Sequence, residues 1–380
     1  MNTLEPLQLL GGLSPQTFMR RHWGKKPLLI RQAIPGFSPL LDRTELLDLA
    51  AMDDVESRLV VQPVLGKEKV WRFSHGPLAR KSLPPFKQRA WSVLVQGVDL
   101  HDERVHTLMN QFRFVPDARL DDVMISYATD CGGVGPHFDS YDVFLLQAHG
   151  KRRWRIGRQK DLRLVPDMPL KILSQFEPED EFVLEPGDML YLPPRWAHDG
   201  VAEGECMTYS VGFRSPSKGE VAREVLQRMA EQAEDEAGDA IYRDPKQPAM
   251  ECSGEVPAAL VQFARDALAV AMRDPLALER AMGEYLTEPK ANVWFTGEEF
   301  SGVSSGAVSV RLDRRTRMMF DAKHVFINGE SFTASGRDAQ LMRALSNSRT
   351  LGAADVARLS APAVDLLADW CQSGWLHADQ

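Results

Sequence analysis

Between residues 58 and 213, short apolar runs with a period of two recur between turns that contain glycine or proline. This period is typical of β-strands, whose successive side chains point to opposite faces. Because no long helical stretch separates the runs, they favour an antiparallel jelly roll over a parallel β/α sheet. A hairpin loop is expected at Ala148-His149-Gly150, with His149 pointing away from any site. The expected strands are 123–128, 142–148, 152–156, 181–184, 189–192 and 207–213.

After Pro216 the apolar period changes to 3.6, with Val221, Val225 and Met229 on one face and charges opposite, which predicts a helix. Two further helices are expected at 257–272 and 275–285. Such a small bundle has few residues for a core of its own. It is therefore a candidate surface for self-association, or else a simple spacer.

From about residue 291 the pattern returns to short strands and then ends in helices. Asn328-Gly329 is a strong signal for a type I′ hairpin, and a hairpin followed by helices indicates a winged-helix module. The expected strands are 308–312, 317–320 and 324–327, and the expected helices are 337–345, 353–359 and 363–373. We therefore predict three domains: a β-rich domain at 1–215, a helical module at 216–290 and a winged-helix-like domain at 291–380.

The charge of the chain does not alter these predictions of fold and domains. The formal net charge is −8, and residues 291–380 carry 9 basic against 10 acidic side chains, so strong nucleic-acid binding is not expected. The sequence has no apolar stretch long enough for a membrane span and no recognisable secretory signal, which predicts a cytoplasmic protein without a membrane partner. The four cysteines are far apart and are expected to be reduced thiols.

The strongest chemical signal is the Gly132–Asp139 segment, where a glycine-rich turn precedes His137 and Asp139. On a strand these two residues share a face, so one imidazole and one carboxylate can bind a single ion. A third ligand is expected at His198, 61 residues after His137, behind a Pro-Gly-Asp turn and a short strand. Two histidines and one carboxylate form the facial triad of non-haem iron(II) oxygenases, which leaves positions open for cosubstrate and dioxygen. A turn histidine capped by an aspartate is the simpler alternative for His137 alone.

Oxygen chemistry at such an iron needs an electron source, which a 2-oxo acid supplies. The distal carboxylate of that acid needs a cation. On the expected strand 152–156, Arg152 and Trp154 share one face while Arg153 and Arg155 share the other. We therefore expect Arg152 to bind the 2-oxo acid, with Ser126 adding a hydroxyl donor. The alternative is a basic strand exposed to solvent.

At this point the chain resembles the bacterial ribosomal oxygenases of the JmjC class, the group that includes the ribosomal protein arginine hydroxylase. The resemblance covers nearly the whole sequence. The segments that carry it are 22–28 (HWGKKPL), 74–77 (SHGP), 91–96 (WSVLVQ), 122–126 (DVMIS), 132–144, 150–157, 185–194 and 209–214 (YSVGFR).

This resemblance implies a double-stranded β-helix of the cupin type, Fe(II) held by His137, Asp139 and His198, and 2-oxoglutarate held by Arg152. It also implies a homodimer formed through the central helices and a C-terminal winged-helix-like domain. The implied substrate is a large-subunit ribosomal protein, hydroxylated at the β-carbon of a residue that is most consistent with arginine. An acidic partner for the guanidinium is then expected, and Asp142 and Asp199 are the candidates.

Two other functions remain open from the sequence. A metal-binding cupin with a winged helix could be a sensor or regulator without oxygenase activity. A small-molecule oxygenase could use the same barrel, although the added modules would then have no evident use.

Overall fold

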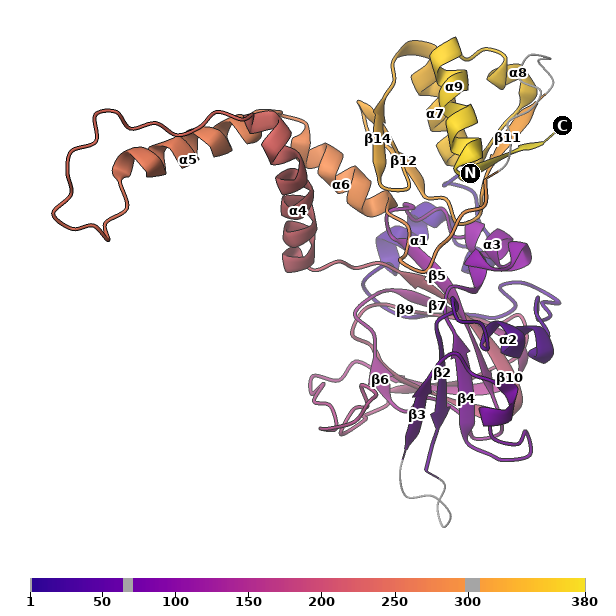
Figure 1. The fold of residues 1–380 in the computed structure, drawn as a ribbon. Helices are drawn as coiled ribbons and strands as arrows, with labels where there is room; N and C mark the ends of the chain where they lie inside the picture. Colours follow the sequence, from indigo (N-terminus) through magenta and orange to yellow (C-terminus); the bar gives the residue numbers. More distant parts are fainter. Residues whose placement is uncertain (1, 64–70, 298–307, 380) are drawn as a thin grey trace. The chain divides into compact units, whose positions relative to one another are not determined.

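The computed structural model describes residues 2–63, 71–297 and 308–379, and the chain divides into two compact units, Met1–Ser215 and Pro216–Gln380. The first unit is built on antiparallel strands in the order β1-β9-β7-β10-β5-β4-β2-β3, with β6 paired to β10 and β8 to β7 (Figure 1). These strands are β1 (Leu28–Ile30), β2 (Ser57–Val61), β3 (Arg72–His75), β4 (Trp91–Val95), β5 (Leu120–Ala128), β6 (His137–Phe138), β7 (Val143–Gly157), β8 (Asp180–Leu184), β9 (Met189–Leu192) and β10 (Ala197–Phe213).

The two longest strands, β7 and β10, organise this unit because they pair along most of their length. The first half of β7 also pairs with β9 and its second half with β8, so a single bent strand belongs to both ends of the jelly roll. The prediction of a hairpin loop at Ala148-His149-Gly150 is wrong. Gly150 has φ +60° and lies so close to the Glu205 carbonyl that no Cβ would fit, and β7 bends there without reversing. His149 is exposed, as expected.

The N-terminal segment packs onto this sheet through aromatic side chains. Helix α1 (Pro15–Arg21) begins with the Ser14 side chain accepting from the Thr17 N–H and with proline at the first position. Beyond it, the Trp23 ring stacks on Tyr191 at 6.1 Å between centroids. The Gly24 N–H donates to both Tyr191 Oη and Asp142 Oδ1. Helices α2 (Arg43–Leu49) and α3 (Glu103–Asn110) complete the unit with three short 3-10 turns, Gln8–Leu10, Arg80–Ser82 and Val98–Leu100.

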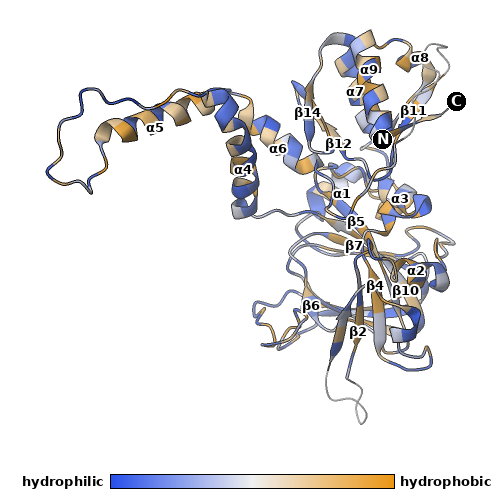
Figure 2. Ribbon diagram, viewed as in Figure 1, coloured by the Kyte–Doolittle hydropathy of each residue, from blue (hydrophilic) through white to orange (hydrophobic). Residues whose placement is uncertain are grey.

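The second unit begins with the helices α4 (Lys218–Ala237), α5 (Ala258–Ala271) and α6 (Ala277–Thr287), close to their predicted positions. α4 starts with a capping box between Ser217 and Glu220. α6 packs tightly on the following strands, since a Cβ at Gly283 would lie 2.3 Å from the Phe326 ring. By contrast, α5 has no buried residue, and apolar residues recur along it (Figure 2).

The remainder of this unit contains two three-stranded sheets, β15-β11-β16 and β12-β13-β14, packed with three helices around a core that includes Leu345 and Trp370. The Asn328-Gly329 turn joins β13 to β14 with positive φ at both residues, as a type I′ hairpin requires. The elements are β11 (Ser309–Leu312), β12 (Met318–Phe320), β13 (His324–Ile327), β14 (Glu330–Thr333), α7 (Gly336–Ser348), β15 (Thr350–Leu351), α8 (Ala353–Val356), α9 (Ala361–Gln372) and β16 (Leu376–Asp379).

Several arginines of the second unit bind backbone carbonyls and carboxylates of the same unit. Arg315 chelates Asp313 at 2.7 and 2.9 Å, and Arg317 donates to the Leu286 carbonyl at 3.1 Å. Arg349 donates to the carbonyls of Asp313 and Thr316. The guanidinium groups of these arginines are thus engaged by hydrogen bonds within the unit. In the part of the chain that the structure describes, we find no helix with the length and apolar character needed to cross a bilayer.

Candidate metal centre

Strand pairing brings the three residues expected at the metal together. β6 pairs with β10 so that His137 lies directly opposite His198, and their ring centroids are 4.2 Å apart. Asp139 Oδ2 is 3.6 Å from His198 Nε2. One ligand atom from each residue lies within 4.8 Å of the other two, whereas cis ligands at ~2.1 Å from one ion would be about 3 Å apart. Small side-chain rotations would therefore bring the three ligand atoms close enough together to bind one ion.

Both imidazoles are oriented by backbone carbonyls two residues earlier. His137 Nδ1 lies 2.9 Å from Gly135 O, and His198 Nδ1 lies 2.9 Å from Trp196 O. Because a carbonyl oxygen only accepts hydrogen bonds, we assign the proton to Nδ1 in each ring. Nε2 of both histidines then carries a free lone pair, and these two lone pairs can bind a metal.

Burial keeps His198 in the form that binds metals. Its side chain is almost fully buried, and this burial, with the neighbouring His137 as a smaller contribution, lowers the pKa of His198 well below its usual range, while Asp139 acts in the opposite direction. The ring is therefore neutral near pH 7, as a ligating imidazole must be.

The glycines before His137 are there because backbone segments approach closely. A Cβ at Gly133 would lie 2.5 Å from the Gly200 carbonyl oxygen, and Gly135 adopts φ +80°. At the start of the turn, the Cys131 N–H donates to Ala202 O. The Gly-Gly-x-Gly pattern is thus needed to fit a tight turn between β10 and its neighbours.

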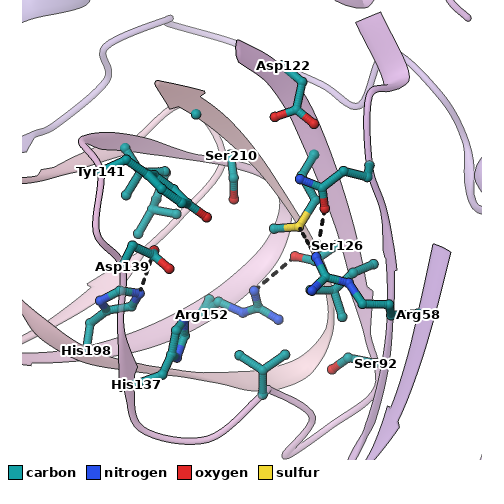
Figure 3. A pocket seen from close by; sticks show the side chains of 18 of the residues that line it. Arg58, Ser92, Asp122, Ser126, His137, Asp139, Tyr141, Arg152, His198 and Ser210 are labelled. Atoms are coloured by element: carbon teal, nitrogen blue, oxygen red, sulfur yellow. Dashed lines mark hydrogen bonds and ion pairs between the residues drawn. The ribbon is translucent and has the colours of Figure 1, made fainter. Parts of the chain in front are cut away.

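The three residues line a cavity of about 230 Å³ that also contains Arg152 and Ser126 (Figure 3). Arg152 is 5% exposed, and its Nη1 donates to Ser126 Oγ at 3.1 Å. Among the described residues, Arg152 Nε has no hydrogen-bond partner. Arg153, the next residue on β7, instead pairs with Glu181 and Glu203 at the surface. Arg152 thus lies inside the cavity, on the face that the alternation of the strand predicted. The alternative of a basic side chain exposed to solvent describes Arg153 instead.

The acidic candidates Asp142 and Asp199 lie elsewhere. Asp142 accepts from Tyr191 Oη at 2.5 Å, Asp199 pairs with Arg155 at 2.5 Å, and neither lines the cavity. Among the described residues, the acidic ones that do line it, apart from Asp139, are Asp121 and Asp122. Asp122 is 3% exposed and shares a face of β5 with Ser126, so the period of two could have identified it.

Two more lining residues were missed by the sequence reasoning. Tyr141 lies above Asp139 in Figure 3, and burial raises the pKa of its phenol, helped by the charges of Asp139 and Asp122. Arg58, from β2, donates to Gln96 at 2.7 Å. Neither belongs to a sequence pattern that marks a site. Tyr141 lies in the loop between β6 and β7, and Arg58 reaches the cavity through the pairing of β2 with β4.

A His-x-Asp…His cluster inside a jelly roll, with a buried arginine lining the same cavity, is the arrangement of non-haem iron(II) oxygenases. Residues 107–221 match the family model for the JmjC domain, and residues 270–377 match that for a ROXA-like winged helix. The ribosomal protein uL16 3-hydroxylase of Escherichia coli (strain K12) is 34% identical over 337 residues, which cover 85% of this chain and 86% of that protein. A probable ribosomal oxygenase of Haemophilus influenzae is 38% identical over 54% of this chain and 50% of that protein.

Solved structures agree. The X-ray structure of E. coli ycfD covers 95% of this chain and 97% of that chain, with 30% identity and a TM-score of 0.78. The structure of YcfD in complex with cobalt and 2-oxoglutarate covers 97% of this chain and 99% of that chain, with 29% identity and a TM-score of 0.75. The chain belongs to the ribosomal oxygenase family of JmjC enzymes. The predicted fold, a β-rich JmjC domain followed by helices and a winged helix, is confirmed, as is the prediction of an oxygenase.

Proposed function

We propose that this protein is an iron(II)- and 2-oxoglutarate-dependent hydroxylase that acts on the β-carbon of an arginine in a large-subunit ribosomal protein. The observation that carries the proposal is that a His-Asp-His cluster and a buried Arg152–Ser126 pair line one cavity. The uL16 3-hydroxylase relative makes uL16 the first substrate to test.

In this proposal His137, Asp139 and His198 would hold Fe(II) through two imidazoles and one carboxylate, the ligand set of non-haem iron(II) oxygenases. Arg152 and Ser126 bind the distal carboxylate of 2-oxoglutarate. When bound, the ion, the 2-oxo acid and dioxygen supply the oxidation of a C–H bond to an alcohol, with succinate and carbon dioxide as co-products. The protein orients the reactants, and its buried lining limits competition from water.

Arginine is favoured over histidine because of the charge of the cavity. Asp122 is buried, with Oδ2 accepting from the Gly97 N–H at 3.0 Å, and Asp121 lies beside it on β5. A carboxylate in this position suits a guanidinium, which is always charged, better than an imidazole that must first gain a proton. We therefore assign the recognition of the substrate guanidinium to Asp122.

The test is turnover with peptides. Iron-loaded protein is mixed anaerobically with 2-oxoglutarate, oxygen is admitted, and succinate is measured with and without uL16 fragments. We expect succinate release to be stimulated by one fragment, and mass spectrometry to place one added oxygen on an arginine. An oxygen on histidine would contradict the arginine assignment, and an absence of succinate in every mixture would contradict the proposal as a whole.

We also propose a homodimer formed through the central helices, in the cytoplasm where ribosomal proteins are available. Apolar side chains on α5 are unusually exposed, with Leu268 at 61% and Leu260 at 40%. A helix with no buried residue contributes little to folding on its own. Binding of a second copy would bury this apolar surface. The alternative of a sensor that binds nucleic acid draws no support from the winged helix, where Arg315, Arg317 and Arg349 are engaged internally.

A further inference from the structure

Gln62 connects the end of β2 to the turn that precedes His137. Its own N–H donates to the Ala90 carbonyl at 2.8 Å, which fixes the residue beside β4. Its half-buried side chain extends to the glycine turn. There the amide nitrogen donates to Cys131 O at 3.0 Å, and the amide oxygen accepts from the Gly135 N–H at 3.2 Å. This amide orientation follows from the partners, because the opposite one would place oxygen against oxygen and N–H against N–H.

The contact with Gly135 matters because the same residue orients a metal-binding histidine. The Gly135 carbonyl oxygen lies 2.9 Å from His137 Nδ1. Gln62 therefore holds the N–H side of Gly135, while the carbonyl side of Gly135 fixes the rotation and tautomer of the imidazole. Gly135 has φ +80°, which glycine adopts without strain, and because a glycine backbone is conformationally free, contacts from outside help to fix it.

Other contacts hold different parts of the same turn. Its start is fixed to β10, since the Cys131 N–H donates to Ala202 O and the Ala202 N–H donates to Gly132 O, both at 2.9 Å. At its end, Pro136 O accepts from the Leu173 N–H at 2.8 Å. Between these anchors, the Gln62 amide spans the turn from Cys131 to Gly135.

We propose that Gln62 is a positioning residue for the metal centre, which acts through Gly135 to keep Nε2 of His137 directed toward Asp139 and His198. This inference rests on the proposed ligand set. Hydrogen-bonded groups behind a ligating histidine set its orientation, and their loss typically weakens metal binding by about 10–100-fold.

The experiment is an anaerobic titration of the full-length protein with Co²⁺, followed by visible absorption, together with thermal melting of the metal-free protein. Gln62→Met keeps the length of the side chain and removes both hydrogen bonds. Gln62→Glu keeps an acceptor for the Gly135 N–H and loses the donor to Cys131 O. Ser57→Ala is the matched control, because it removes a buried hydrogen bond, to the Ala50 carbonyl, from the same strand without touching the turn.

We expect Gln62→Met to weaken Co²⁺ binding by about 10–100-fold, and Gln62→Glu to restore most of the affinity. Ser57→Ala should lower the melting temperature while leaving Co²⁺ affinity unchanged. The proposal is overturned if Gln62→Met binds Co²⁺ as tightly as the wild type, or if Gln62→Glu is no better than Gln62→Met. His137→Ala distinguishes a failure of the Gln62 proposal from a failure of the proposed ligand set. If this variant still binds Co²⁺ with wild-type affinity, the ligand assignment itself is wrong.

Discussion

Replacement of Arg152 by methionine tests the proposed cosubstrate site, with opposite effects on binding and on stability. Arg152 is 5% exposed, and its guanidinium donates to the Ser126 hydroxyl and lies over the face of Trp154, 5.6 Å from the ring centroid. Its Nε is unpartnered among the residues described. Such a cation is poorly compensated until an anion joins it, so the site is prepared for a carboxylate.

The expected loss follows from the hydrogen bonds a carboxylate would accept there. Two charge-assisted bonds from the guanidinium, at about 1.5–3 kcal/mol each, are worth roughly 3–6 kcal/mol. The lower figure already corresponds to a loss of affinity on the order of 100-fold. Methionine fills much of the same volume, so cavity formation should add little.

The assay is calorimetric titration of the cobalt-loaded protein with 2-oxoglutarate in the absence of oxygen. Arg152→Met should lose affinity on the order of 100-fold or more, while Co²⁺ affinity stays the same. The melting temperature of the ligand-free variant should be equal or higher, because a poorly compensated buried cation has been removed. Arg153→Met is the control, since it alters an arginine on the opposite face of the same strand.

Two results would refute this reasoning. If Arg152→Met binds 2-oxoglutarate within a few-fold of the wild type, Arg152 is not the anchor, and Arg58, the other arginine lining the cavity, becomes the candidate. If Arg153→Met loses as much affinity as Arg152→Met, the effect reflects the general charge of the strand and not a specific contact.

Three further predictions concern the substrate, the winged helix and the dimer. Asp122→Asn should raise KM for an arginine-containing uL16 fragment by about 10–100-fold, the loss of one charge-assisted bond, with 2-oxoglutarate affinity unchanged; an unchanged KM would exclude Asp122 as the guanidinium partner. Asp313, 3% exposed, has its pKa held well below the usual range because the hydrogen bonds from Arg315 and His377 outweigh the effect of its burial. Its folded pKa is depressed, so this stabilisation is complete above the unfolded pKa of about 3.9 and is lost as pH falls through the folded value. Asp313→Asn should therefore cost about 3 kcal/mol at pH 7 and flatten the acid side of a stability-versus-pH curve; equal slopes for variant and wild type would contradict this. Leu268→Glu on α5 should convert a dimer to monomers in sedimentation equilibrium, whereas a wild-type protein that is already monomeric would rule out the proposed interface.

The sequence predicted features that depend on neighbouring residues. The spacing of His137 and Asp139 places them on one face of any strand, and alternation alone separated Arg152 from Arg153. The Asn328-Gly329 hairpin was equally local, because φ preferences do not depend on the rest of the fold.

The errors arose where distant chain segments decide the outcome. Gly150 gave the signal of a turn, yet β7 continues through it because β10 pairs with both of its halves. Asp142 was a candidate partner for the substrate guanidinium, but Tyr191 and the Gly24 N–H, far away in the chain, bind it at another place. The sequence around a glycine or an aspartate does not indicate which distant residue it will contact.

By itself, the sequence determined the chemical types of the centre, two imidazoles and a carboxylate, and the periodicity that brings each to the interior. Only the tertiary structure decided that His137 lies opposite His198, that Asp122 and Tyr141 line the same cavity as Arg152, and that Gln62 supports the turn before His137. The physical reason is that side-chain direction is set by the local backbone, whereas the meeting of strands 61 residues apart is set by strand register, which depends on the packing of the whole barrel.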